Sequence, residues 1–149
     1  MSMTIHAVLP EPEELKARLP LSASLAEMKK ARDEEIRQVF TGRSERFLVL
    51  VGLCSADNED AVCEYAERLA KVNEKVKEKL LLIPRVYTNK PRTTGEGYKG
   101  MLHQPSPDQA PNLLEGLVAI RHMLLHVMQV SGFGCADEML YPENRSYLD

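Results

Sequence analysis

The chain has 149 residues, of which 44% are hydrophobic and 28% charged, and its formal net charge is -3 at pH 7. This length is enough for one ordinary domain with a hydrophobic core, and the composition is typical of a soluble globular protein. The small negative charge gives no electrostatic reason to expect binding to nucleic acid or to an anionic membrane surface.

The sequence contains no recognisable targeting segment. Residues 1–6 lack the basic region and apolar stretch of a signal peptide, and the longest apolar run, residues 47–53, has the length of a strand rather than of a membrane span. The three cysteines form no CxxC pair and are odd in number, which indicates free thiols in a reducing compartment. We therefore expect a cytoplasmic protein.

The N-terminal part is expected to be an arm followed by a helix. Residues 1–23 hold three prolines among acidic and apolar residues, and so predict an arm rather than a core element. The run Ser24-Leu25-Ala26-Glu27 matches a capping box, which predicts that a helix begins at Ser24 and that Gly42 ends it.

Two buried strands with a helix between them are expected next. Residues 47–52 are continuously apolar, as in a strand covered on both faces of a parallel sheet. Asp57 is expected to cap a helix that carries an apolar stripe from residue 62 to residue 76. Residues 80–87 predict a second strand, with a bulge or break at Pro84 because proline cannot donate to a ladder.

The last third predicts a functional loop, a helix and a short strand. Residues 88–111 are polar and rich in glycine and proline, and loops of this length inside compact domains are usually functional or disordered. An apolar helix is expected from Leu113 to Val130, ended by Gly132, and a third strand from Phe133 toward Glu138. The alternation of helices and strands predicts parallel strands joined by crossover helices.

Reactive side chains follow the predicted strand ends, which is where parallel α/β folds bind ligands. Cys54 follows the first strand, Arg85 ends the second, and Glu138 ends the third. The loop after the second strand adds three cations and two hydroxyls: Lys90, Arg92, Thr93, Thr94 and Lys99. Arginine, lysine and threonine together suit a phosphate group, although a solvated basic loop is the alternative interpretation.

Taken in order, these segments resemble the type I 3-deoxy-7-phosphoheptulonate (DAHP) synthases. The resemblance rests on Leu19-Pro20-Leu21-Ser22, Gly52-Leu53-Cys54-Ser55, Tyr65-Ala66-Glu67-Arg68-Leu69-Ala70, Arg85-Val86-Tyr87, Lys90-Pro91-Arg92-Thr93-Thr94, Tyr98-Lys99-Gly100 and Ala136-Asp137-Glu138. It covers most of this chain but only the first part of the family's length. It implies an incomplete (β/α)8 TIM barrel, in which residues 24–149 supply the first three strands with their crossover helices.

The resemblance also implies an activity. The family joins phosphoenolpyruvate to D-erythrose 4-phosphate with water, releasing phosphate, in the first step of the shikimate pathway of aromatic amino-acid biosynthesis. It needs a divalent metal ion, here Mn, Fe, Co or Zn, and its members are commonly regulated by an aromatic amino acid. By this resemblance Cys54 is a metal ligand, Arg85 binds phosphoenolpyruvate, and Lys90 is the catalytic lysine between the two substrates.

Four further residues take roles from the same resemblance. Arg92 and Thr93 match residues that hold the sugar phosphate, and Lys99 and Glu138 match residues that line the phosphoenolpyruvate pocket. The chain departs from the family at several neighbouring positions, most notably at Asp137, where the family has a threonine.

Other candidate ligands have simpler interpretations. His122 and His126 lie one helical turn apart with no third ligand nearby in the sequence, so they are expected to be surface or packing histidines rather than metal ligands. Cys63 and Cys135 are expected to be small buried residues rather than reactive thiols.

Two hypotheses follow for the chain as a whole. In the first it is the N-terminal part of a DAHP synthase and is inactive alone, because the family's remaining metal ligands lie on later strands and a full barrel takes about 250 residues. In the second it is a truncated, non-catalytic module that binds phosphate ligands or another chain. A homo-oligomer is expected in both cases, because a parallel sheet of three strands leaves an apolar face uncovered.

Overall fold

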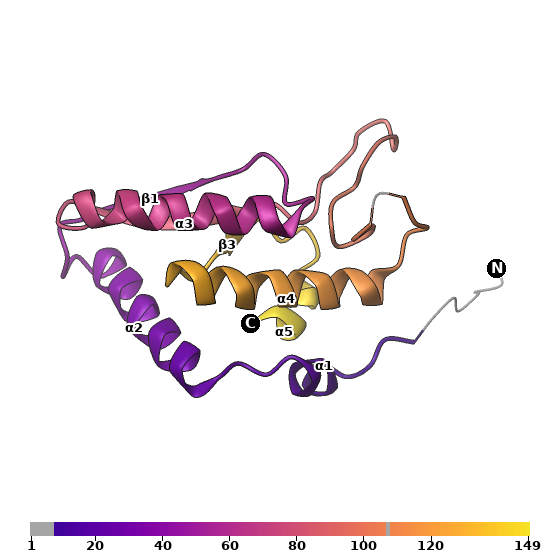
Figure 1. Ribbon diagram of the computed structural model, residues 1–149, viewed down its shortest axis with the longest axis horizontal. Helices are drawn as coiled ribbons and strands as arrows, with labels where there is room; N and C mark the ends of the chain where they lie inside the picture. Colours follow the sequence, from indigo (N-terminus) through magenta and orange to yellow (C-terminus); the bar gives the residue numbers. More distant parts are fainter. Residues whose placement is uncertain (1–7, 107) are drawn as a thin grey trace.

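The computed structural model describes residues 8–106 and 108–149 as an α/β fold (Figure 1). The elements, in chain order, are α1 (Pro12–Arg18), α2 (Ala23–Phe40), β1 (Phe47–Gly52), α3 (Glu59–Val76), β2 (Leu80–Val86), α4 (Leu113–Ser131), β3 (Ala136–Asp137), the 3-10 helix η1 (Pro142–Asn144) and α5 (Arg145–Leu148). The predicted alternation of helices and strands is therefore confirmed between α2 and β3.

The three strands form one parallel sheet in the order β1-β2-β3, as predicted. The pairing of β1 with β2 is continuous from Phe47 opposite Leu80 to Gly52 opposite Arg85, so the expected bulge or break at Pro84 is wrong. On its other side β2 pairs only at Arg85 and Val86. Pro84 therefore has no partner on β3, and its missing N–H interrupts no ladder there.

The third strand is shorter than predicted. It pairs only at Ala136 and Asp137, whereas the sequence predicted a start at Phe133. Phe133 is 1% exposed, and the guanidinium of Arg32 on α2 lies 4.8 Å from the centre of its ring. Its side chain packs against α2, and its backbone does not pair with β2.

The N-terminal caps of α2 and α3 differ from the predicted caps by one or two residues. The hydroxyl of Ser22, not Ser24, accepts from the backbone N–H of Leu25, so α2 begins at Ala23. The side chain of Asn58, not Asp57, accepts from the N–H of Ala61 at 2.9 Å. Several residues near each helix start carry capping side chains, and the backbone conformation decides which one is used.

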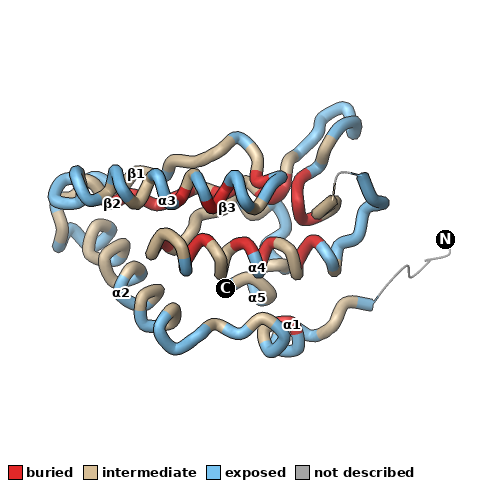
Figure 2. Tube along the Cα trace, viewed as in Figure 1, coloured by how far each residue is buried: buried red, intermediate tan, exposed pale blue. Residues whose placement is uncertain are grey.

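The core lies between the sheet and the adjacent helices α3 and α4 (Figure 2). The inner face of α4 is completely buried at Leu117, Ile120, Met123 and Val127. By length and hydropathy alone α4 also resembles a membrane span, but the same properties are typical of the core helix of a globular domain. As predicted, it ends at Gly132, which has a left-handed backbone with φ of 72°.

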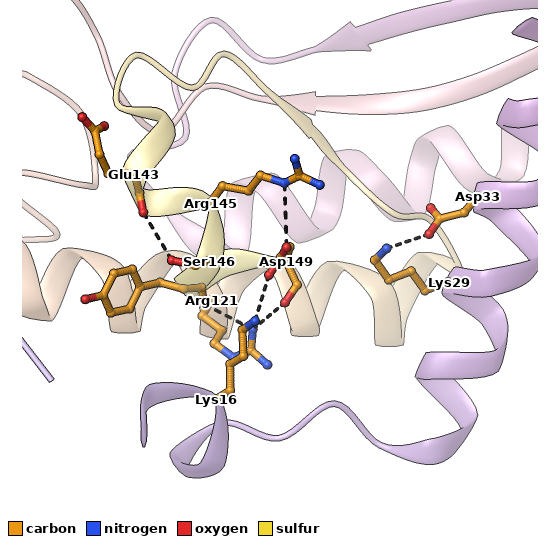
Figure 3. Close-up of polar contacts among 9 residues, drawn as sticks. Lys16, Lys29, Asp33, Arg121, Glu143, Arg145, Ser146 and Asp149 are labelled. Carbon is orange, nitrogen blue, oxygen red and sulfur yellow. Dashed lines mark hydrogen bonds and ion pairs between the residues drawn. The ribbon is translucent and has the colours of Figure 1, made fainter. Parts of the chain in front are cut away.

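The N-terminal segment is not a separate arm. Leu15 on α1 is fully buried in the core cluster, so the prediction that the arm lies outside the core is wrong for the described residues 8–23; residues 1–7 lie outside the described part. The buried Arg121 on α4 donates to the carbonyl of Leu19 at 2.9 Å and to that of Tyr147 at 3.3 Å. Lys16 on α1 also pairs with Asp149 at 2.8 Å (Figure 3). The N-terminal segment is therefore held against both α4 and the C-terminal residues.

Apolar side chains remain exposed along the outer strand. Phe47 and Leu50 on β1 are 71% and 54% exposed, and Phe40 at the end of α2 is 79% exposed. A cavity of about 310 Å³ also lies between α2, β2 and α4, lined by Ile36, Leu82 and Leu124 among others. The uncovered apolar surface that the sequence predicts is therefore present.

Candidate functional site

The carboxyl ends of the three strands bring the predicted site residues to one edge of the sheet. Because all three strands are parallel, Gly52, Val86 and Asp137 end at the same edge. Cys54 lies two residues after the end of β1, Glu138 follows β3 directly, and Arg85 is the penultimate residue of β2.

Arg85 is the most firmly held of these side chains. Its Nη1 donates to Glu138 Oε1 at 2.7 Å, and its Nη2 donates to the carbonyl of Leu53 at 3.0 Å. Its guanidinium lies 5.1 Å from the centre of the Tyr87 ring. The Arg85 guanidinium, which could bind an anionic ligand, is thus oriented by residues that follow all three strands, and one of its N–H groups already binds a carboxylate.

The backbone beside Arg85 needs a glycine in β1. A Cβ atom at Gly52 would lie 1.8 Å from the carbonyl oxygen of Arg85, so any side chain there would displace β2. The close approach of these two strands sets the position from which Arg85 extends.

Lys90 lies against the thiol of Cys54. Its Nζ is 3.3 Å from Cys54 Sγ and 5.7 Å from the centre of the Tyr87 ring, while its backbone N–H donates to the carbonyl of Lys99 at 2.9 Å. The predicted metal ligand and the predicted catalytic lysine, far apart in the sequence, are therefore neighbours.

The long loop is ordered against the core at both of its ends. Thr88 and Asn89 are 2% and 3% exposed, and the N–H of Leu102 donates to the carbonyl of Thr88 at 3.1 Å. Gly100 makes this closure possible, since it has φ of 100° and a Cβ atom there would lie 2.3 Å from the Thr88 carbonyl oxygen.

The tip of the loop carries the remaining predicted residues, and they are exposed. The Nε of Arg92 donates to the carbonyl of Tyr98 at 2.8 Å, and Thr93 and Lys99 are exposed. Within residues 8–106 and 108–149, no hydrogen bond or ion pair joins these three side chains to Arg85 or Lys90. The structure therefore gathers Cys54, Arg85, Lys90 and Glu138 and leaves the other three at the loop tip.

Asp137 has a structural role that sequence reasoning missed. Its carboxylate accepts from the backbone N–H of Thr88 at 3.2 Å and from the Thr88 hydroxyl, which ties β3 to the start of the loop. Burial raises the pKa of the Asp137 carboxyl above its usual value, against the lowering effect of the hydrogen bonds from Thr88. The sequence signal for this role was an aspartate at position 137, where the resembled family has a threonine.

Three buried polar atoms next to the site have no hydrogen-bond partner among the described residues. They are Ser55 Oγ, Asn89 Nδ2 and Tyr98 OH, and each belongs to the residue beside Cys54, Lys90 or Lys99. Buried polar groups in folded proteins are nearly always paired, so unpaired atoms on residues next in sequence to the predicted site residues are typical of a surface that receives a polar ligand or further protein.

The described residues do not form a complete set of metal ligands at this edge. Cys54 is exposed and offers its sulfur, but the histidine, cysteine and acidic side chains of the described chain form no group of three around it. A metal centre needs three or four ligands, so these residues alone do not complete one.

A second group of polar side chains lies between α3 and α4. His122 and His126, which are expected from the sequence to be surface or packing residues, both contact Glu59 on α3, and Cys63 lies close to Glu59 and His126. The sequence alone did not indicate these contacts, because Glu59 comes from a helix far earlier in the chain.

Comparison with known proteins agrees with the resemblance seen in the sequence. Residues 20–148 match the family model described as the DAHP synthetase I family. The Tyr-sensitive phospho-2-dehydro-3-deoxyheptonate aldolase of Escherichia coli is 37% identical over 150 residues, which cover 98% of this chain and 40% of that protein. The phenylalanine-inhibited enzyme of Saccharomyces cerevisiae is 35% identical over 122 residues, covering 81% of this chain and 32% of that protein.

A solved structure shows the same fold. The phospho-2-dehydro-3-deoxyheptonate aldolase of Francisella tularensis superimposes with a TM-score of 0.86 at 33% identity, covering 99% of this chain and 42% of that one. This chain thus spans about two fifths of the length of the Escherichia coli enzyme and of the Francisella tularensis structure. The match to the family model over residues 20–148 shows that the chain belongs to the DAHP synthetase I family.

Proposed function

We propose that this chain forms the first three strands of a (β/α)8 barrel and carries the phosphate-binding part of a DAHP synthase site. The reaction joins phosphoenolpyruvate, erythrose 4-phosphate and water, and gives DAHP and phosphate. The observation that carries the proposal is the convergence of Arg85, Lys90, Cys54 and Glu138 at the carboxyl edge of the sheet. Active sites of such barrels lie at this edge.

Each cation has a distinct role in the proposal. Arg85 binds phosphoenolpyruvate, because its guanidinium already donates to a carboxylate oxygen at 2.7 Å, and the carboxylate and phosphate of the substrate offer the same kind of anionic acceptor. Lys90 is the catalytic residue between the two substrates, and it places one positive charge beside Cys54. Holding two anionic reactants together in this way lowers the entropic part of the barrier.

The exposed loop completes the substrate contacts. Arg92 and Thr93 bind the phosphate of erythrose 4-phosphate, and Lys99 lines the phosphoenolpyruvate pocket with Glu138. The carbonyl of Lys99 already accepts from the N–H of Lys90, so a movement of the loop tip would also shift Lys90. This coupling supports a site that tightens when both substrates are bound.

Cys54 contributes one ligand to a divalent metal ion whose other ligands lie outside the described residues. Such an ion, when bound, polarises the aldehyde oxygen of the sugar phosphate. Because the described residues alone do not surround Cys54 with ligands, we propose that this chain by itself binds substrate without turnover.

Regulation and assembly belong to the same proposal. The relatives from Escherichia coli and Saccharomyces cerevisiae are described as Tyr-sensitive, Phe-sensitive and phenylalanine-inhibited, which supports an aromatic amino-acid effector for the complete protein. A homo-oligomer is supported by the exposed Phe47 and Leu50. A cytoplasmic location is supported by the free cysteines.

A second candidate function is a non-catalytic module that binds phosphate ligands or another chain. It is favoured by the same incomplete ligand set around Cys54 and by the apolar residues exposed on β1. Both candidates predict phosphate-ligand binding, so binding alone does not separate them.

A hybrid protein separates the two candidates. The matched part of the Escherichia coli Tyr-sensitive relative is replaced by this chain, and phosphate release from phosphoenolpyruvate is measured with and without erythrose 4-phosphate. The synthase proposal predicts release that needs both substrates and that Lys90→Ala abolishes. A folded hybrid without turnover favours the binding module, and turnover that survives Lys90→Ala contradicts the assigned role of Lys90.

A further inference from the structure

Four metal-binding side chains meet between α3 and α4, apart from the residues at the strand ends. Glu59 and Cys63 are one helical turn apart on α3, and His122 and His126 are one turn apart on α4. Residues with this spacing lie on the same face of a helix, so each helix presents a pair to its neighbour.

The side chains of this group are in contact. His126 Nδ1 lies 2.7 Å from Glu59 Oε1, and His122 Nδ1 lies 2.9 Å from Glu59 Oε2. The ligand atoms of Glu59, Cys63 and His126 all lie within 4.8 Å of one another. Bonds from a zinc-like ion to such atoms are about 2.0–2.3 Å long. Small side-chain rotations would therefore let these three atoms bind one ion.

The group has both a buried and an accessible side. Cys63 is 6% exposed and packs in the core, whereas the side chains of Glu59 and His126 are 27% and 38% exposed. The two imidazoles also line an open surface depression of about 320 Å³ with Leu19, Pro20, Leu125 and Gln129. An ion can therefore reach the group from solvent and be held on its inner side by the thiol.

We propose that Glu59, Cys63 and His126 form a second metal site, selective for a zinc-like divalent ion, that joins α3 to α4. Thiolate, imidazole and carboxylate are the ligand types that zinc takes, usually in a tetrahedral arrangement. His122 binds the second oxygen of Glu59 and acts as a positioning residue that orients the carboxylate. Water completes the coordination.

The charges around the thiol favour a cation over a free thiolate. Burial, followed by the charges of Glu59, Asp60 and Glu67, raises the pKa of Cys63 to about 11. A bound ion replaces the thiol proton, which is released to solvent. The acidic side chains of Glu59, Asp60 and Glu67 lie near the thiol and attract a divalent cation.

Binding of an ion at this group is expected to stabilise the folded chain. An ion that binds only the folded chain stabilises it by mass action, so the unfolding temperature rises with the concentration of the ion.

Cobalt absorption tests this site in the full 149-residue chain. The measurement uses a Cys54→Ala background, which removes the exposed thiol at the strand ends. Titration with Co²⁺ is expected to give one bound ion per chain with a thiolate-to-cobalt charge-transfer band, and Zn²⁺ is expected to displace it. Adding Cys63→Ser is expected to abolish the band, and adding His122→Ala to weaken binding by about 10–100-fold.

Matched controls decide between this site and non-specific binding. In the same background Cys135→Ser removes the other remaining thiol, which interacts with Cys63 but is not one of the proposed ligands, and the band is expected to be retained. His126→Ala changes a partly exposed residue, so it tests a ligand without opening the core, and it is expected to weaken binding by at least tenfold. The proposal is overturned if the Cys54→Ala chain gives no thiolate band, if the band survives Cys63→Ser, or if His126→Ala binds Co²⁺ with unchanged affinity.

Discussion

The Nζ of Lys90 and the Sγ of Cys54 lie 3.3 Å apart, which joins the loop after β2 to the end of β1. Neither residue is fixed by local sequence alone. The parallel pairing of β1 with β2 brings their carboxyl ends together, and the Lys90–Lys99 backbone hydrogen bond folds the loop over them. This contact supports the proposal that Lys90, as a cation, and Cys54, as a metal ligand, act on the same substrates.

Glu138 competes with anionic ligands for Arg85. Its carboxylate occupies the Arg85 fork at 2.7 Å and would repel a phosphate. Glu138→Gln is expected to tighten the binding of inorganic phosphate by about fivefold, equivalent to ~1 kcal/mol for a partly exposed ion pair. Phosphate titration by calorimetry measures the effect. Glu143→Gln, at an exposed acid after β3, is the control and should leave binding unchanged. Weaker phosphate binding by Glu138→Gln would contradict this role.

The Asp137 carboxyl makes stability depend on pH. Its folded-state pKa is raised above 3.8 mainly by burial, so its contribution to stability is fully present at low pH and is lost as the pH rises through the folded-state pKa. Asp137→Asn removes the titration and keeps the shape of the side chain. The stability of the variant relative to the parent chain is expected to increase from acidic to neutral pH.

Urea unfolding at several pH values checks this expectation. Asp60→Asn on the solvent face of α3 is a suitable control, because it changes the same chemical group at an exposed position. If the stability of Asp137→Asn relative to the parent chain decreases from acidic to neutral pH, the carboxylate is stabilised, not destabilised, in the folded chain.

Arg121 fastens the two ends of the described chain to α4. It is 5% exposed and donates to the carbonyls of Leu19 and Tyr147. Arg121→Met is expected to lower the free energy of unfolding by about 2–4 kcal/mol, because it leaves buried carbonyl groups without a donor.

Chemical denaturation measures this loss, and limited proteolysis measures the release of the N-terminal segment. Arg68→Met, which breaks only the exposed pair with Glu64, serves as the control and should cost less than about 0.5 kcal/mol. Equal losses for the two variants would mean that Arg121 does not hold the segment.

The exposed apolar side of β1 is expected to cause self-association. Leu50 is 54% exposed on a strand whose only described neighbour is β2, and Leu50→Lys places a charge there. Light scattering after size-exclusion chromatography should show oligomers for the parent chain and a shift toward monomer for Leu50→Lys. Val72→Lys, at a 48% exposed position on α3, should behave like the parent chain. A monodisperse parent monomer would contradict the expectation.

The sequence predicted the order of elements because apolar runs and turn residues are local signals. The strand at residues 47–52 and the helix ending before Gly132 were located from such runs and are confirmed. The positions of Cys54, Arg85 and Glu138 at one edge follow from the parallel topology, which the alternation of helices and strands also predicts.

Local sequence patterns could not predict contacts between segments that are far apart in the chain. The pairing of Arg85 with Glu138, and of Glu59 with the two histidines of α4, depends on the angle and register at which whole elements pack. The burial of Leu15 was missed for the same reason, since a short proline-rich segment gives no periodic signal. The helix caps differed because neighbouring residues such as Ser22 and Ser24 have equivalent side chains.

Arg85 and Lys90 are proposed to form a phosphoenolpyruvate site in this chain. Calorimetric titration of the 149-residue chain with phosphoenolpyruvate tests this proposal, with Arg85→Ala, Lys90→Ala and, as a control cation outside the site, Lys75→Ala on α3. We expect one site per chain. Affinity should fall by about tenfold or more in each of the first two variants, since each loses a charge-assisted hydrogen bond of about 1.5–3 kcal/mol, and should be unchanged in the third. Equal binding by the parent chain and both site variants, or no binding by the parent chain, would contradict it.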